Sequence, residues 1–431
     1  MWVLGLVVGL FPLFIWLLIS FNDWRYCLTS NKGAKLPPGN MGCPIIGELI
    51  TFLWHFKFMG TPDKFIWNRI AKYGNTGIYR THLFGSPSII TCSPEFNRFV
   101  MGTETENGSF IAGWPCPRLF GEQSINMVEG GRHKRLRRFL LEAINKPESL
   151  PNIIIRLQPA FKDSFENWVV KGKFSAVDEI RSLAFSNICS LLISFQRSPM
   201  LENMERMYRG LLAGMRASPI NMPGTAFHYS LQCRKRLSEI IYSEIRYRKS
   251  NKGSVKTDFL QELMDSVDSN DNKLSEEEII DNITSLLLGG YEPTALSMMW
   301  ALYYLSKYPK VLSKLKEENN TIWMHKGEDK FLNFNDAKKM TYTTKTVAKD
   351  TKFNGYKFPK GWKVIIWLRT IHVDSQYFKD PLEFNPERWE EVHPKPGVYN
   401  VFGLGPRLCL RNNLSKMQLL IFLHHICIDY K

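Results

Sequence analysis

The sequence predicts a mainly α-helical protein with a smaller β portion. Helical periodicity dominates from about residue 130 to about residue 320, and the strongest helix starts at Ser275, with Glu278 completing a capping box. Two shorter stretches have the composition of β structure. At 431 residues, 44% of them hydrophobic and 13% aromatic, the chain can bury a large core and is not disordered.

Residues 1–21 contain no charged side chain and are dominated by Leu, Val, Ile, Phe and Trp. A helix needs roughly 20 such residues to cross a bilayer. A cleaved signal peptide is the alternative, but it would normally carry a positive first region and small residues near the cut, which this stretch lacks. We expect an uncleaved single-pass anchor. Arg25, Lys32 and Lys35 follow it, so the positive-inside rule places the remainder in the cytosol.

Residues 22–40 are expected to form a linker and hinge. Pro37 and Pro38 stiffen the backbone there, and Gly39 allows it to reverse, which suits a connection that orients a globular body against a membrane. The body that follows spans residues 41–431. Its length alone would suggest two or three domains, but large enzymes with a single core also reach this size, and we expect one domain.

The first β unit is predicted as a hairpin, with strands at residues 77–80 and 88–91 and a turn at residues 85–87. A second β-like unit covers residues 351–367. Between them lies the long helical region, in which the one obvious polar loop is at residues 268–273. The order of these elements predicts a helical body that carries a small sheet.

The formal net charge of +15 invites a nucleic-acid partner, but the basic residues are dispersed and no recognition motif accompanies them. We therefore expect no nucleic acid as a partner. A basic surface also suits anionic lipids and acidic electron-transfer proteins. The eight cysteines are scattered without paired spacing, which predicts neither a disulfide framework nor a zinc site.

The most specific motif is a cysteine preceded by an aromatic residue, two glycines and an arginine: Phe402, Gly403, Gly405, Arg407 and Cys409. It resembles the haem-binding loop of the cytochromes P-450, F-G-x-G-x-R-x-C-x-G. The resemblance implies haem b as cofactor, with the Cys409 thiolate as axial iron ligand, the glycines turning against the porphyrin and Arg407 facing a propionate. A buried structural cysteine beside a glycine-rich turn is the alternative reading.

A second motif lies in the middle of the strongest helix, over residues 289–294. It resembles the family's A/G-G-x-D/E-x-T element, in which the helix crosses the distal face of the haem. The resemblance implies catalytic roles for Thr294, beside iron-bound dioxygen, and for Glu292, in a proton relay. Pro293 fits because the family already opens this turn. The alternative is a buried helix with a proline kink and a chance acid–threonine pair.

The basic cluster at residues 131–138 contains His133 and Arg137 at helical i, i+4 spacing. The pair resembles a plant variant of the family's W-x-x-x-R element, which implies that both residues contact a haem propionate. The alternative is a solvated basic face that docks a reductase, and Arg132, Lys134, Arg135 and Arg138 are assigned to that face.

Three features depart from the family pattern. Residues 384–389 resemble the F-x-P-E-R-F/W segment, yet residues 340–382 contain no glutamate, so the E-x-x-R partner of Arg388 is missing. We expect a deletion near residues 343–351 that removes this helix, and a short C-terminus without the closing β region. Finally, Arg411 replaces the last glycine of the loop, so its side chain must find another path or displace the cofactor.

Several stretches resemble the plant ent-kaurenoic acid oxidases and β-amyrin 11-oxidases, among them residues 77–85, 355–363 and 421–425. The resemblance implies an endoplasmic-reticulum membrane enzyme of gibberellin or triterpenoid metabolism. It would be a haem-thiolate monooxygenase that oxidises a terpenoid or sterol-like substrate with O2. Its electrons would come from NADPH through NADPH-cytochrome P-450 reductase, and its partners would include membrane lipid. The alternative is a degenerate family member, or the product of a gene whose exons are incompletely identified, without stable haem or activity.

Overall fold

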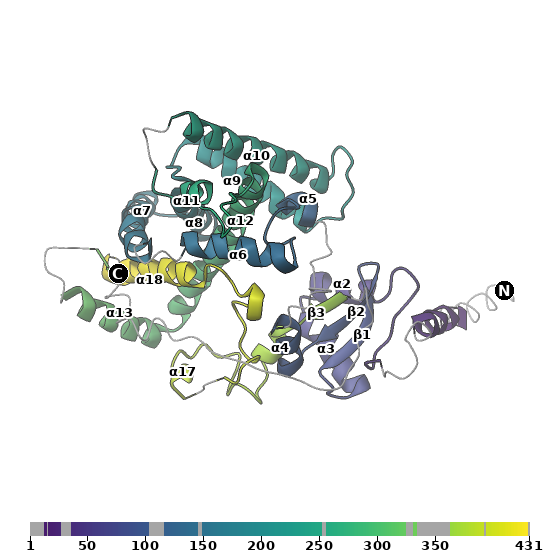
Figure 1. The fold of residues 1–431 in the computed structure, drawn as a ribbon. Coiled ribbons are helices and arrows are strands. Elements are labelled where there is room, and N and C mark those ends of the chain that lie inside the picture. The colour runs from purple at the N-terminus through teal and green to yellow at the C-terminus, as the bar shows by residue number, and fades with distance from the viewer. Residues whose placement is uncertain are drawn as a thin grey trace. The chain divides into compact units, whose positions relative to one another are not determined.

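The computed structural model describes most of the chain and divides it into two compact units. The described residues are 13–14, 16–26, 36–102, 116–144, 149–251, 256–324, 331–333, 363–391 and 394–429. The first unit comprises residues 1–104 and 346–408, and the second comprises residues 105–345 and 409–431. Helices dominate both and a single small sheet lies in the first (Figure 1), so the predicted mainly α class with a smaller β portion is confirmed.

The sheet of the first unit has three strands in the order β1-β2-β3. Strands β1 (Ile78–Leu83) and β2 (Ser86–Thr91) form the predicted antiparallel hairpin, and β3 (Lys363–Ile366) pairs parallel to β2. The turn, however, lies at Phe84 and Gly85, both with positive φ (53° and 69°), and Ser86 already pairs with Leu83. The predicted turn at residues 85–87 was one residue late, because Pro87 fixes a negative φ and cannot occupy this tight turn.

Side chains of the hairpin alternate between two apolar clusters, as the strand period of two requires. Tyr79 and Ile90 pack with Phe65 of α3 (Pro62–Tyr73) on one face. Ile78 and Ile89 pack on the other face, with Phe96 and Val100 of α4 (Pro94–Gly102). The remaining short elements of this unit are α2 (Leu49–Leu53), the π-helix η1 (Trp54–Phe58), α16 (Leu368–His372), α17 (Arg388–Glu391) and the 3-10 turn η2 (Gly405–Arg407).

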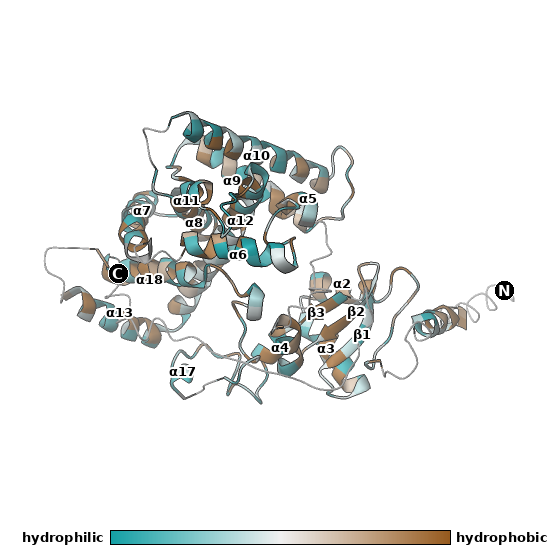
Figure 2. Cartoon of the chain, viewed as in Figure 1, coloured by the Kyte–Doolittle hydropathy of each residue, from teal (hydrophilic) through white to brown (hydrophobic). Residues whose placement is uncertain are grey.

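The second unit is a helical assembly with one large apolar core. Its helices are α5 (Cys116–Phe120), α6 (Gly130–Ile144), α7 (Ser149–Lys171), α8 (Ala176–Ile193), α9 (Pro199–Met215), α10 (Ala226–Ser250), α11 (Phe259–Asp265), α12 (Glu276–Lys307), α13 (Pro309–Met324) and α18 (Asn412–Asp429). The predicted helical region is thereby confirmed. Figure 2 shows hydrophobic and hydrophilic bands along α10, whose apolar side turns inward with Phe227, Leu237 and Ile241.

Helix α12 forms the centre of this unit and begins as predicted. Ser275 caps it by accepting a hydrogen bond from the Glu278 N–H, and the Glu278 carboxylate accepts one from the Ser275 N–H. The helix continues without interruption through Pro293 and ends at Lys307, after which Pro309 opens α13. Its middle turns are buried almost all round, which is expected of a helix enclosed by α8, α10 and α18.

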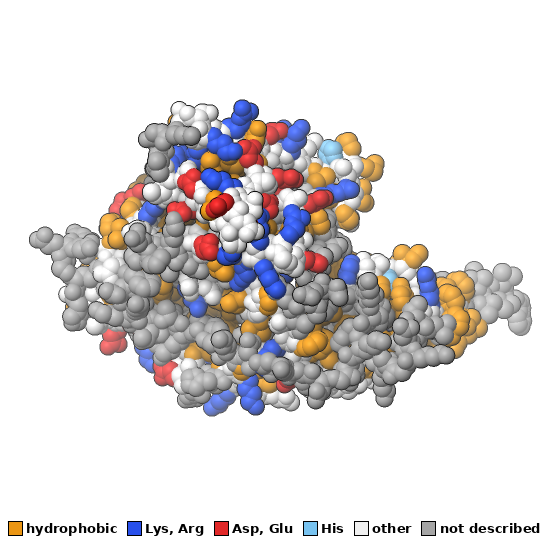
Figure 3. Space-filling view, viewed as in Figure 1, with side chains coloured by type: hydrophobic (Ala, Val, Ile, Leu, Met, Phe, Trp, Pro, Cys, Tyr) orange, Lys and Arg blue, Asp and Glu red, His pale blue; other side chains and the backbone are white. Residues whose placement is uncertain are grey.

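Part of the predicted membrane anchor is described. Residues 16–26 are helical, whereas residues 1–12 and 15 lie outside the described residues, as does the predicted deletion at residues 343–351. In the described ranges, no helix combines the length and the apolar composition that a membrane crossing needs. Large apolar side chains of this N-terminal helix are exposed (Figure 3): Leu13, Phe14, Trp16, Leu17, Phe21 and Trp24.

Candidate active site

The cysteine loop turns on two glycines with left-handed backbones. Gly403 has φ 74° and Gly405 has φ 62°, a region in which other residues are strained. A Cβ on Gly403 would lie 3.8 Å from the Arg407 carbonyl oxygen, an ordinary contact, whereas a Cβ on Gly405 would lie 2.4 Å from the carbonyl oxygen of Met101 at the end of α4. Gly405 also opens η2, in which its carbonyl accepts the Leu408 N–H at 3.0 Å. The glycine pattern therefore has a local structural reason.

The boundary between the two units falls inside this motif. Phe402 is half-buried and Arg407 is exposed, and both belong to the first unit. Cys409 belongs to the second unit, where it precedes α18 with an exposed, free thiol. An exposed sulfur remains accessible to a ligand, which a buried structural cysteine would not be.

Thr294 lies on the side of α12 that meets α18. It is 3% exposed, and its hydroxyl donates to the Gly290 carbonyl at 2.8 Å. The same hydroxyl approaches the Ser415 hydroxyl on α18 at 3.5 Å. Pro293 lacks an N–H, so the side chain of Thr294 supplies an extra hydrogen bond next to the turn that the proline weakens.

Glu292 faces a different helix. Its carboxylate accepts a hydrogen bond at 2.9 Å from the Arg181 guanidinium on α8, and it is 8% exposed. Residues two apart on a helix point to nearly opposite sides, so Glu292 and Thr294 do not meet in this structure. No local pattern indicated Arg181 as a partner, because α8 and α12 are far apart along the chain.

Tyr291 lies beside Glu292 in a buried aromatic group that the sequence did not single out. Its ring packs edge-on to Phe185 at 5.2 Å and to Tyr208 at 6.4 Å. Burial, and then the charges of Glu292 and Glu205, raise the pKa of the Tyr291 hydroxyl far above its usual value. This hydroxyl therefore stays protonated at physiological pH.

His133 and Arg137 lie one turn apart on α6, as their spacing predicts. His133 is 2% exposed and Arg137 is half-buried, so this side of the helix is not a freely solvated face. Arg132, Lys134 and Arg138 are exposed, as expected.

Arg135 departs from the prediction that it belongs to the solvated basic face. Its guanidinium pairs with Asp268 at 2.9 Å and with Glu278 at 3.2 Å, and donates to the Lys273 carbonyl at 3.1 Å. It therefore ties α6 to the polar loop and to the first turn of α12. Hydrogen bonds from Arg135 and from the loop N–H groups lower the pKa of Asp268 to about 2.

Arg388 has two backbone carbonyls in place of the carboxylate that the family pattern implies. Its guanidinium donates to the Asp380 carbonyl at 2.7 Å and to the Glu383 carbonyl at 3.0 Å. Within the described ranges no acidic side chain pairs with it. The loop around the residue therefore satisfies part of the donor capacity of the guanidinium.

Arg411 is buried between α18 and α12, at 6% exposed. Its guanidinium donates to the Leu286 carbonyl, and the other terminal nitrogen, Nη1, has no hydrogen-bond partner among the residues that the structure describes. A Cβ built on Gly290 would lie 2.5 Å from that nitrogen. Loss of hydration lowers the pKa of Arg411 to about 10, although the nearby Cys409 opposes this shift.

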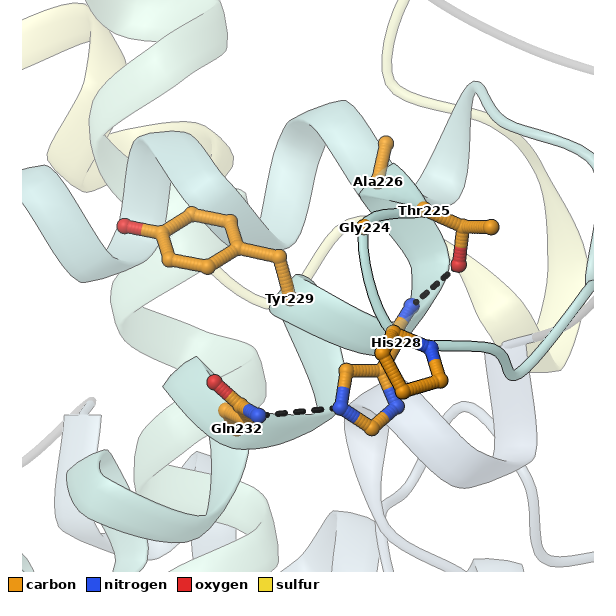
Figure 4. Close-up of a pocket in the computed structure, with 7 residues that line it drawn as sticks. Gly224, Thr225, Ala226, His228, Tyr229 and Gln232 are labelled. Atoms are coloured by element: carbon orange, nitrogen blue, oxygen red, sulfur yellow. Dashed lines mark hydrogen bonds between the residues drawn. The ribbon is translucent and has the colours of Figure 1, made fainter.

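A surface hollow of about 510 Å³ lies at the start of α10. Thr225 caps the helix by accepting the His228 N–H at 3.2 Å, and the His228 ring bonds Gln232 at 2.9 Å (Figure 4). None of the predicted site residues lines this hollow, and its rim is open. It is a feature of the loop between α9 and α10, separate from the candidate site residues.

The comparisons with known proteins agree with the fold. The family model described as Cytochrome P-450 matches residues 37–348 and 343–430 of the chain. The solved structure "Retinoic acid bound cyanobacterial CYP120A1" is similar with a TM-score of 0.76 and 25% identity, over 92% of each chain. This likeness confirms the fold that the sequence resemblance implied.

Among curated proteins, the chain is 35% identical to "Ent-kaurenoic acid oxidase 2" of Arabidopsis thaliana, over 100% of this chain and 92% of that protein. It is 34% identical to "Beta-amyrin 11-oxidase" of Glycyrrhiza uralensis, over 96% of this chain and 88% of the relative. Both names fall in the plant branch that the sequence resemblance indicated.

Proposed function

We propose that this chain, which belongs to the cytochrome P-450 family of monooxygenases, oxidises a terpenoid or sterol-like substrate of the ent-kaurenoic acid or β-amyrin type. The oxidation uses O2, and its electrons pass from NADPH through a reductase. The observation that carries this proposal is the similarity to two plant terpenoid oxidases along nearly the whole chain. Identity of about a third supports the substrate class and leaves the individual substrate open.

The chemistry of the proposed oxidation would be supplied by haem, which the family implies. Cys409 would hold the iron. Six further residues would surround the porphyrin: His133, Arg137, Phe402, Gly403, Gly405 and Arg407. Thr294 and Glu292 would hold and pass protons, for which Thr294 must release the Gly290 carbonyl and Glu292 must release Arg181.

We also propose anchoring to the endoplasmic-reticulum membrane through the N-terminal segment, with the body facing the cytosol. The exposed apolar side chains of the helix at residues 16–26, including Trp16, Phe21 and Trp24, support this proposal. Tryptophan and phenylalanine favour the boundary between lipid and water. Expression of the full chain with a fluorescent tag at its C-terminus, followed by carbonate extraction of membranes, tests it; release into the soluble fraction would contradict it.

The described residues do not fit a haem as they stand. Gly290 leaves a hollow on α12 because it has no side chain, and the guanidinium of Arg411 fills that hollow. Thr294, one turn further along α12, directly approaches Ser415 of α18. The two helices therefore contact each other through side chains at the level where the motif residues lie.

This misfit favours a second candidate function, a family member that keeps the architecture without stable haem or catalysis. The family model supports it too, since its two matching segments meet at residues 343–348, where the sequence predicts the missing helix. Arg388, whose guanidinium bonds two carbonyls instead of a carboxylate, agrees with that loss.

One experiment separates the two candidates. The full chain is expressed with a plant reductase, reduced with dithionite and exposed to CO, and the difference spectrum is recorded. Thiolate-ligated haem gives a diagnostic shifted Soret band in this spectrum. An active oxidase is then also expected to turn over ent-kaurenoic acid or β-amyrin in microsomes with NADPH. Absence of the band from folded, membrane-bound protein would reject the oxidase and leave the second candidate.

A further inference from the structure

Arg411 belongs to the second unit, and its side chain lies against a place where α12 presents no side chain of its own. Arg411 precedes α18, and its carbonyl accepts the first regular helical hydrogen bond from Ser415 at 3.0 Å. From there the side chain crosses to α12, where its guanidinium donates to the Leu286 carbonyl and lies against Gly290. A Cβ on Gly290 would meet three guanidinium atoms at 2.5 to 2.9 Å.

Gly290 and Arg411 are therefore complementary, because the hollow left by one is filled by the other. Neighbouring Gly289 is almost unaffected, since a Cβ there would lie 3.8 Å from the guanidinium. The filling is specific to one turn of α12. It also brings α12 and α18 into direct contact, which Thr294 and Ser415 extend one turn further.

This filling is imperfect for the arginine itself. Nη1 is buried without a hydrogen-bond partner, and no carboxylate neutralises the guanidinium in the described part of the chain. A buried cation with an unsatisfied donor is unfavourable. A ligand with enough binding energy can therefore displace the Arg411 guanidinium from its place beside Gly290.

We propose that Arg411 closes the tetrapyrrole site of this chain, because its guanidinium occupies the hollow at Gly290 and haem binds only when that side chain withdraws. This inference rests on the proposed haem chemistry of Cys409. The apparent affinity for the ligand falls in proportion to the fraction of molecules in which the site is open. If the closed arrangement dominates by tenfold or more, removal of the side chain raises the affinity by at least about tenfold.

The test is a titration of hemin into the full-length apoprotein in detergent, followed by the Soret absorbance. Arg411→Gly removes the side chain and is expected to bind hemin at least about tenfold more tightly than the natural chain. Arg411→Met keeps a long side chain without charge and is expected to stay within about threefold of the natural chain, because the hollow remains filled. Arg411→Ala replaces the glycine variant if the latter does not fold, as judged by far-UV circular dichroism.

Arg156→Ala is the matched control. Arg156 lies on α7 and also donates to a backbone carbonyl, that of Ser190 on α8 at 2.7 Å. It is expected to leave hemin binding unchanged. The proposal would be overturned if Arg411→Gly and Arg411→Ala bound hemin with the affinity of the natural chain. It would also be overturned if Arg411→Met bound hemin as tightly as Arg411→Gly.

A double variant distinguishes this inference from the proposed function. If the gain in Arg411→Gly disappears when Cys409 is also changed to serine, the opened site and the cysteine ligand belong together, as proposed. If the gain persists in the double variant, Arg411 closes a site in which Cys409 is not the ligand, and the proposed role of Cys409 fails while the closure stands. If a correctly folded Arg411→Gly variant binds hemin no more tightly than the natural chain does, the proposed closure by Arg411 is rejected.

Discussion

Gly403 and Gly405 share a left-handed backbone but differ in their surroundings, which makes them a matched pair at the residue scale. Gly403→Ala is expected to cost about 1–2 kcal/mol, the price of a Cβ in this conformation. Gly405→Ala carries the same strain and also presses a Cβ against the Met101 carbonyl, which adds about 1–3 kcal/mol. Urea unfolding of the two variants measures the difference; equal midpoints would contradict the close approach at Gly405.

The Glu292–Arg181 ion pair can also be tested at this scale. The Glu292 carboxylate is mostly buried, and it accepts a hydrogen bond at 2.9 Å from the half-buried Arg181 guanidinium. A double-mutant cycle with Glu292→Gln and Arg181→Met is expected to give a coupling energy of about 1 kcal/mol or more in unfolding experiments. The exposed pair Lys249–Glu276 serves as the control and should couple by about 0.5 kcal/mol or less.

A coupling for Glu292 and Arg181 no larger than that of the control would show that Glu292 is not held on α8. It would then be available to turn elsewhere. A strong coupling would instead mean that Glu292 can act on protons only after this ion pair opens.

At the scale of elements, the capping box of α12 is the feature that the sequence predicted most fully. Ser275→Ala removes the side-chain oxygen that accepts the Glu278 N–H, and is expected to lower stability by about 1 kcal/mol. Ser297→Ala on the same helix is the control. Its hydroxyl only returns to the Pro293 carbonyl on an exposed face, so the change should be neutral or slightly stabilising.

Unfolding midpoints in urea check both serine variants. Ser275→Asp is expected to keep most of the stability of the natural chain, because aspartate also caps helices well. If Ser275→Ala and Ser297→Ala behaved alike, the cap would not hold the first turn of α12.

Elements near special backbone geometry were harder to predict. The start and end of α12 follow from local signals, namely a capping serine at one end and Pro309 at the other. The hairpin turn was displaced by one residue because Phe84 adopts a positive φ, for which an aromatic residue gives no sequence signal. Partner choices such as Arg135 with Asp268 depend on packing between distant segments.

At the scale of the whole molecule, buried histidines predict a loss of stability in mild acid. Burial lowers the pKa of His82, His372 and His425, with Lys363 adding to the effect at His82 and Asp429 opposing it at His425. Below pH 6.5 the unfolded chain takes up protons at these sites while the folded chain resists, so stability falls as pH falls through 6.5.

The measurement is the urea midpoint between pH 7.5 and pH 5.5. His372→Gln, which removes one of the buried rings while keeping an acceptor for the Asn400 N–H, should flatten the decline. This pH range differs from the one in which Asp268 acts. The lowered pKa of Asp268 contributes stability that is lost only as pH falls from about 4 towards 2. If the urea midpoint of His372→Gln fell with pH as steeply as that of the natural chain, the buried His372 ring would not contribute to the loss of stability in mild acid.

The family and the mainly helical class were predictable from the sequence, because they depend on local patterns: a cysteine after spaced glycines, a capping box, and i, i+4 spacing on α6. Which helix each side chain meets became visible only in the folded chain. It paired Glu292 with Arg181, and it directed Arg411 into the hollow beside Gly290. Contacts between segments more than a hundred residues apart depend on how helices pack, which no local pattern encodes.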